Sequence, residues 1–176
     1  DNGIWEEYEE VHASSVGACL AALIKISNYF YVNKNTIEKG KETLNKLLPK
    51  ESETKEVDLA LLTLIWPFNI VSEEQRNKIL HNIETKLLRN KGVIRYSGDK
   101  YYSNGKEAEW TMGLVFLAII YKQLGNFEKY KEFMQRTFSA LNEKGELPEL
   151  YFGGTDEHND NSPLGWAQSL FIVAMR

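Results

Sequence analysis

The apolar residues of this chain follow two patterns that take turns along the sequence. In one pattern a stretch is apolar on nearly all sides, which is typical of a helix surrounded by other helices. In the other pattern apolar residues recur every three or four positions among charged ones, which is typical of a helix with one face in water. The first pattern covers residues 11–31, 58–65, 108–124 and 163 onward, and the second covers 36–48, 72–89 and 126–141. The alternation predicts about seven helices, inner and outer in turn, and no segment has the two-residue period of a strand.

Local signals support several of these boundaries. Pro49 and the Trp66-Pro67 pair each follow a predicted helix. Ser72 and Gln75 have the spacing of a capping box at the start of the next one. Pro163 suits the first turn of the last helix.

The predicted helices form an all-α assembly of helical hairpins. In a ring of hairpins, every connection from an outer helix back to an inner one leaves at the same end. The segment with Glu6, the loop with Arg95 and the loop with Glu149 all have this position in the chain. We therefore expect them to gather on one rim, around the mouth of the inner helices, as a pocket for a polar ligand requires.

Length, charge and cysteine content narrow the class of protein. The 176 residues suffice for one domain with a sizeable core. A formal net charge of -4 and dispersed Lys and Arg residues argue against nucleic acid as a partner. The longest apolar run, residues 16–24, is too short to span a bilayer, so we expect a soluble protein without membrane contact, with a cytoplasmic location slightly favoured over a secreted one. Cys19, the single cysteine, lies inside that run and is expected to be a buried structural thiol.

Two glutamates stand in positions that suit acid–base chemistry. Pro148 fixes the backbone directly before Glu149, and aromatic and glycine residues follow, so this carboxylate sits in a shaped, partly apolar turn. Glu6 lies beside apolar residues and the like-charged Glu7, and both poor solvation and that charge favour its protonated form. Glycosidic cleavage needs one carboxylic acid and one carboxylate. Glu6 is therefore the candidate acid and Glu149 the candidate base.

Each of these features also has an interpretation without a catalytic role. A loop carboxylate usually faces solvent, and a Glu-Glu pair before a helix usually compensates the helix dipole. In this interpretation Arg95 and Asp99 form a surface ion pair and Tyr101 is a packing residue. Glu109-Trp110 then provide packing and dipole compensation at the start of the following helix. His12 and His158 have no Cys, Asp or His partner at metal-ligand spacing, so we expect neither a metal nor a cofactor.

Six short motifs occur in a characteristic order across almost the whole chain. They are Gly3-Ile4-Trp5-Glu6-Glu7, Asp58-Leu59-Ala60-Leu61-Leu62, Arg95-Tyr96-Ser97-Gly98-Asp99 with Tyr101-Tyr102 and Asn104-Gly105, Glu109-Trp110, Leu147-Pro148-Glu149, and Ser162-Pro163-Leu164-Gly165-Trp166-Ala167. Together they resemble the C-terminal half of the glucoamylase-like catalytic domain of glycoside hydrolase family 15. The resemblance extends over residues 1–176.

The resemblance implies part of an (α/α)6 barrel that hydrolyses α-glucosidic bonds from non-reducing ends with inversion, without metal or cofactor. Glu6 then resembles the general acid and Glu149 the general base that activates water. If inversion holds, their carboxyl groups stand roughly 6.5–9.5 Å apart. The resemblance also implies a set of substrate-binding residues, with Trp166 supporting the base loop: Trp5, Glu7, Arg95, Asp99, Tyr101, Trp110 and Trp166.

The family's barrel has about twelve helices in a chain about twice this long, whereas this sequence predicts about seven. The chain also begins at Asp1 and ends at Arg176 within an apolar stretch. We therefore expect a piece of a larger enzyme, inactive in isolation, whose partners are an α-glucan or α-glucoside and the N-terminal half of the barrel, in the same parent chain or another chain.

Three functions remain open from the sequence. The leading one is an exo-acting α-glucosidase of the glucoamylase type, and a trehalase or a dextran-acting relative shares its acid and base. A second class is a non-catalytic carbohydrate-binding or regulatory module, because this fold also occurs in phosphorylase kinase regulatory subunits. A plain helical interaction domain is the third, and it predicts no common rim for Glu6, Arg95 and Glu149.

Overall fold

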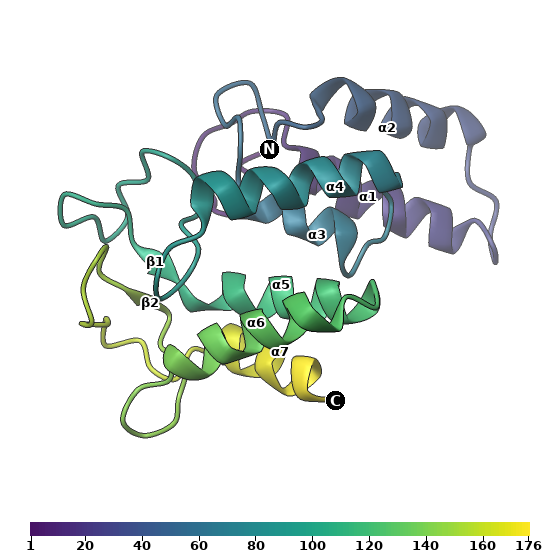
Figure 1. Cartoon of the computed structure of the whole chain (residues 1–176). Helices are drawn as coiled ribbons and strands as arrows, with labels where there is room; N and C mark the ends of the chain where they lie inside the picture. The colour runs from purple at the N-terminus through teal and green to yellow at the C-terminus, as the bar shows by residue number, and fades with distance from the viewer. The chain divides into compact units, whose positions relative to one another are not determined.

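A computed structural model describes all residues from 1 to 176, and they form two compact units, residues 1–82 and residues 83–176. Figure 1 shows both units, with helices as their main elements. Each unit is built from helices that pack on one strongly apolar helix, as the alternation of patterns predicts.

The first unit is a set of antiparallel and crossing helices around α1. Its elements are α1 (Ala13–Ile26), α2 (Lys34–Leu47), the 3-10 turn η1 (Leu59–Leu61), α3 (Leu62–Ile65) and α4 (Glu73–Asn82). Helices α1 and α2 form a hairpin, and η1 and α3 also lie against α1 (Figure 1). Leu20 of α1 and Leu44 of α2 are buried, as are all residues from 57 to 65. These buried leucines form the core of the unit.

Side-chain caps determine where several of these helices begin. The Asp58 carboxylate accepts a hydrogen bond from Ala60 N (2.7 Å) at the start of η1. Before α4, Ser72 Oγ accepts from Gln75 N (3.2 Å), while Gln75 Oε1 accepts from Ser72 N (2.9 Å). The predicted capping box is therefore confirmed, with both orphan amides satisfied.

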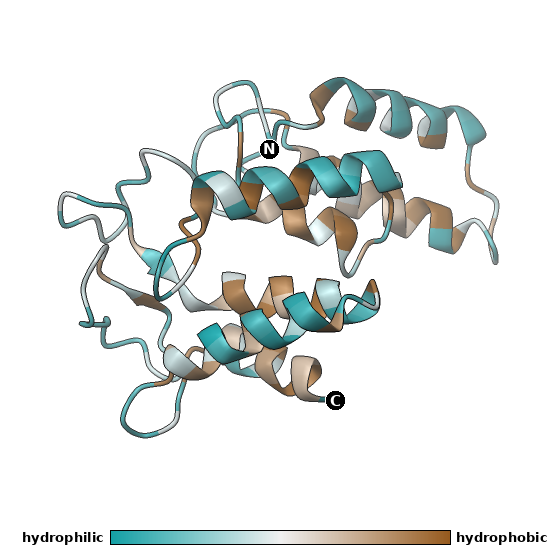
Figure 2. Ribbon diagram, viewed as in Figure 1, coloured by the Kyte–Doolittle hydropathy of each residue, from teal (hydrophilic) through white to brown (hydrophobic).

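The second unit is built around α5. Its elements are the π-helical turn η2 (Ile83–Leu87), β1 (Glu109–Trp110), α5 (Thr111–Gln123), α6 (Phe127–Ser139), β2 (Leu150–Tyr151) and α7 (Gly165–Met175). Every residue from 111 to 120 is buried in α5, and α6 and α7 both pack on it. Figure 2 shows α5 and α7 rich in apolar residues, whereas α6 carries a hydrophilic face. This is the predicted alternation of inner and outer helices.

The structure corrects several sequence expectations. A two-stranded antiparallel sheet, β1 with β2, occurs where no strand was expected. Helix α1 is shorter than the predicted 11–31, and only four of its residues are buried, so Cys19 is exposed instead of buried. Helix α7 begins at Gly165, two residues after Pro163, which therefore precedes the helix. Both α1 and α7 carry half-exposed apolar side chains, such as Ile26 and Ile172. None of the helices combines the length and apolar character needed to cross a membrane.

Candidate functional site

A miniature sheet assembles the predicted site residues of the second unit. Trp110 pairs with Leu150 across β1 and β2, and an isolated bridge joins Trp110 to Val93. Val93 comes two residues before Arg95, and Leu150 comes directly after Glu149. Backbone pairing thus brings the Arg95 loop and the Glu149 loop to opposite sides of the same short strand.

Arg95 and Asp99 form a buried ion pair, which corrects the alternative of a surface pair. Arg95 Nε donates to Asp99 Oδ2 and Arg95 Nη2 to Asp99 Oδ1, both at 2.7 Å. Arg95 is 4% exposed and Asp99 1%. The bidentate geometry fixes the plane of the guanidinium, as is typical of strong arginine–carboxylate pairs.

Two aromatic rings flank this guanidinium. Arg95 Cζ lies 4.9 Å from the centroid of the Tyr101 ring and 5.1 Å from that of Trp110. The two rings stack on each other with centroids 5.8 Å apart and an interplanar angle of 29°. Tyr101 is nevertheless 45% exposed, so the stack is rigid and also accessible from solvent. Such a surface suits the apolar face of a sugar ring, next to polar groups for its hydroxyls.

Glu149 lies half-buried beside this aromatic surface. Burial raises the pKa of Tyr101, and the nearby charge of Glu149 raises it further, against the opposing effect of Arg95. The Glu149 loop is attached to the first turn of α5, where Thr111 Oγ1 donates to Pro148 O (2.5 Å) and Thr111 N to Glu149 O (3.3 Å). One carboxylate oxygen, Glu149 Oε2, accepts hydrogen bonds from Asn159 Nδ2 (2.6 Å) and Asn161 Nδ2 (2.7 Å).

Glu109 attaches two further loops to the same strand. The sequence predicts Glu109 at the start of a helix, but it lies in β1 and is 3% exposed. Its Oε2 accepts from Lys91 N (2.7 Å) and its Oε1 from Gly154 N (2.8 Å). A buried carboxylate that satisfies two backbone amides stabilises the loops that carry them.

Trp166 lies on the first turn of α7, where its ring packs edge-on against Phe116 with centroids 6.3 Å apart. The base loop is joined to α7 through other groups. Leu147 N donates to Gln168 Oε1 (3.2 Å), and Leu164 N donates to Leu147 O (3.0 Å). Support of the base loop by Trp166 itself stays a prediction.

In the first unit, the predicted binding residues Trp5 and Glu7 are held by groups from the loop before η1. Trp5 Nε1 donates to both oxygens of buried Asp58, at 2.9 and 3.1 Å. Lys55 Nζ donates to Glu7 Oε2 at 2.7 Å and lies 4.0 Å from Asp58 Oδ2. Lys55 is itself buried, so this pairing is scarcely screened by solvent.

Glu6 occupies a strained turn that leads toward α1. Its backbone φ of 55° lies in the left-handed region, which is uncommon for a residue with a side chain. The side chain is exposed and Ile4 is 36% exposed, so the expected apolar surroundings of Glu6 are wrong for this chain. Its role as acid stays a prediction, as does its distance from Glu149.

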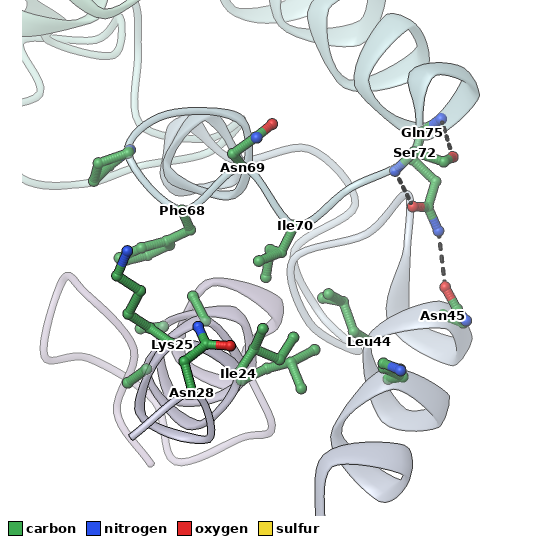
Figure 3. A pocket seen from close by; sticks show the side chains of 16 residues that line it. Ile24, Lys25, Asn28, Leu44, Asn45, Phe68, Asn69, Ile70, Ser72 and Gln75 are labelled. Atoms are coloured by element: carbon green, nitrogen blue, oxygen red, sulfur yellow. Dashed lines mark hydrogen bonds between the residues drawn. The ribbon is translucent and has the colours of Figure 1, made fainter. Parts of the chain in front are cut away.

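A groove in the first unit lies elsewhere. It has a volume of about 870 Å³ and lies between α1, α2 and the loop that leads to α4. Figure 3 shows its lining, with Ile24 and Lys25 on α1, Leu44 on α2, and Phe68 and Ile70 on the loop. None of the residues predicted to act on a sugar lines this groove.

Sequence reasoning missed four residues that hold the predicted ones in place: Lys55, Asn159, Asn161 and Gln168. Lys55 lies three residues before Asp58, and the two asparagines stand on either side of Asp160 soon after the acidic loop. The sequence signal for the two asparagines was the Asn159-Asp160-Asn161 run. Their contact with Glu149 depends on a chain reversal, which the pattern of apolar residues does not predict.

The comparisons with known proteins lead in two directions. No protein-family model matches the chain. The alpha regulatory subunit of phosphorylase b kinase from Oryctolagus cuniculus skeletal muscle is 27% identical over 231 aligned positions, which cover 98% of this chain and 19% of that protein. A probable alpha subunit from Caenorhabditis elegans is 28% identical, with 98% and 19% covered. A probable beta subunit from Drosophila melanogaster is 26% identical, with 99% and 20% covered.

The similar solved structures are glycosidases. A wild-type glycosidase matches with a TM-score of 0.80 and 18% identity, over 97% of this chain and 53% of the other. A variant glycosidase in complex with glucose matches with a TM-score of 0.79 and 17% identity, over the same shares. The chain has the fold of part of an α/α helical toroid. This similarity confirms the predicted fold class. The chain spans about half the length of these glycosidases and about a fifth of the length of the curated relatives.

Proposed function

We propose that this chain is part of an α-glucoside-binding helical barrel that acts as a regulatory or carbohydrate-binding module. The curated relatives, which are regulatory subunits of phosphorylase b kinase, support the regulatory part of this proposal. The glycosidase fold supports the carbohydrate part. The proposed ligands are α-glucans or α-glucosides, and the chain corresponds to the C-terminal half of the barrel.

The accessible stack of Tyr101 on Trp110 beside Arg95 and Glu149 is the observation that carries this proposal. Its ring atoms offer an apolar surface, and the neighbouring carboxylates offer acceptors for hydroxyl groups. Asp99 keeps the guanidinium rigid, so little side-chain entropy is lost when a ligand binds. In the first unit, Trp5 and Glu7, held by Asp58 and Lys55, stay predicted binding residues.

Hydrolysis of the bound glucoside, with inversion, is the second candidate function. The geometry of Glu149 favours it, because two amides hold Oε2 and no group of the chain donates to Oε1. Oε1 can therefore accept a hydrogen bond from a water that attacks the anomeric carbon, while Glu6 gives its proton to the leaving oxygen. Trehalose and dextran-type substrates share this chemistry, since the acid and base are common to them.

One panel of variants of the full-length protein tests both functions. Binding of maltotriose, trehalose and isomaltose is measured by calorimetry, and glucose release is measured on the same sugars. Tyr101→Ala is expected to weaken binding roughly tenfold, because it removes one ring of the stack. Tyr130→Phe is the matched aromatic control, because its hydroxyl donates to Ala174 O on α7 and not to the candidate site.

The variants Glu6→Gln and Glu149→Gln separate the two functions. A regulatory module binds α-glucosides without glucose release in any variant. A hydrolase releases glucose, and each of the two substitutions is expected to reduce kcat at least a hundredfold. Unchanged turnover in either variant would refute the role of that glutamate. Unchanged affinity in Tyr101→Ala would refute the proposed binding surface.

A further inference from the structure

The segment that follows Glu149 folds back on it as an irregular hairpin. Glu149 N donates to Asn161 O (2.9 Å), Asn159 N donates to Leu150 O (3.2 Å), and Phe152 N donates to Glu157 O (2.9 Å). In an extended segment, side chains two positions apart lie on the same side. Asn159 and Asn161 are two positions apart, and the hairpin aligns both with Glu149.

Both asparagines donate to the same oxygen of Glu149. The distances to Oε2 are 2.6 Å from Asn159 Nδ2 and 2.7 Å from Asn161 Nδ2, which are short for N–H···O bonds. Neither amide carries a charge, so together they stabilise the carboxylate without neutralising it. The other oxygen, Oε1, is left for a ligand.

Asn159 donates to Glu149 through Nδ2, but the oxygen of its own amide has no hydrogen-bond donor. Asn159 is 4% exposed, and its buried Oδ1 accepts no hydrogen bond from the chain. A buried acceptor without a donor is uncommon in folded proteins and occurs where another requirement outweighs it. Here the requirement is the donation of Nδ2 to Glu149.

We propose that Asn159 and Asn161 are positioning residues, which hold the Glu149 carboxylate in one orientation and present its Oε1 to the sugar or to the attacking water. This inference rests on the proposed function, in which Glu149 contacts the ligand. It is equally applicable to binding and to hydrolysis, because both need a hydrogen-bond acceptor in a fixed orientation.

The test follows the orientation of Glu149 directly and through the ligand. Carbon-13 NMR of the Glu149 carboxyl group in the full-length protein is compared with maltotriose affinity at one fixed pH. In Asn161→Leu the carboxyl signal is expected to move and maltotriose affinity to fall roughly tenfold, because the carboxylate loses a donor that fixes its orientation. Asn159→Leu is expected to act in the same direction, and so is Asn161→Asp, which replaces the donating amide by an acceptor.

Asn142→Leu is the matched control, because Asn142 Nδ2 donates to a different loop glutamate, Glu146, at 3.2 Å. It is expected to lower the stability of the loop without changing the Glu149 carboxyl signal or the maltotriose affinity. Asn161 is exposed, so its variants keep the test available if Asn159 variants fail to fold. A carboxyl signal and an affinity equal to those of the wild type in both asparagine variants overturn the inference. Unchanged maltotriose affinity in Tyr101→Ala instead overturns the proposed function, whatever the NMR spectra show.

Discussion

Glu51 is a titratable side chain of the first unit that is 1% exposed and has no part in the candidate site. Ser14 Oγ donates to its Oε1 at 2.5 Å, and His12 Nδ1 lies 3.6 Å from the same oxygen. Burial raises the pKa of Glu51 to about 8, and the charge of Asp58 adds to this effect, while Ser14 and Lys55 oppose it. The folded protein therefore favours the protonated form of this carboxyl group.

The raised pKa predicts a loss of stability with rising pH. Between the ordinary pKa of 4.5 and the raised one of about 8, the unfolded chain releases a proton that the folded chain retains. Stability falls wherever the folded state binds more protons, so the free energy of unfolding decreases across this range. Glu51→Gln is expected to remove this decrease, with a gain at pH 8 of a few kcal/mol and a ceiling of roughly 5 kcal/mol.

Urea unfolding of Glu51→Gln and of the wild type at pH 5 and pH 8 checks this expectation. Glu53→Gln is the control, because Glu53 lies in the same loop and is exposed. It is expected to leave the pH dependence unchanged. A pH dependence in Glu51→Gln equal to that of the wild type would show that another group is responsible.

At the scale of elements, α1 and α3 approach each other closely at Gly17. A Cβ atom at this position would overlap the Leu64 side chain and would lie 3.0 Å from Ile70 Cδ1. Leu64 is fully buried, so its side chain has little room to move. The absence of a side chain at Gly17 therefore permits the contact with α3.

Gly17→Ala is expected to destabilise the first unit by roughly 1–3 kcal/mol through overpacking, although alanine is the better helix former. Thermal unfolding followed by circular dichroism measures this effect. Gly165→Ala provides the comparison, since no atom lies within 4 Å of the added methyl group at the start of α7. Equal unfolding temperatures for the two variants would contradict the close contact.

At the scale of the whole molecule, inner helices carry apolar side chains that are 38–52% exposed: Ile24, Ile26, Ile172, Val173 and Met175. The solved glycosidases extend to about twice the matched length, since the match covers 53% of their chain. We propose that further helical hairpins, in the same parent chain or in a partner, cover these faces. Exposed apolar patches of this kind mark interaction surfaces.

Ile172→Asp is expected to destabilise the full-length protein by roughly 3 kcal/mol, because it places a charge in an apolar interface. The stability of the isolated 1–176 chain is expected to stay almost unchanged. Phe127→Asp is the control in both proteins, since Phe127 is 60% exposed on the outer helix α6. Light scattering of the native protein provides a separate check. A stable, hydrolytically active monomer of 20 kDa would contradict the proposed complement.

The sequence by itself determined the helices, their alternation and several of their caps, because these depend on neighbours within about four residues. It also placed Arg95, Asp99 and Tyr101 in one loop and Glu149 in another, and the expected common position of these loops follows from the order of the helices. Only the tertiary structure decided that these loops meet through two-residue strands, since so short a ladder has no detectable period. It alone showed that Arg95 is buried, that Cys19 and Glu6 are exposed, and that two asparagines hold Glu149. Each of these depends on groups ten or more residues away, or on a face that no part of this chain covers.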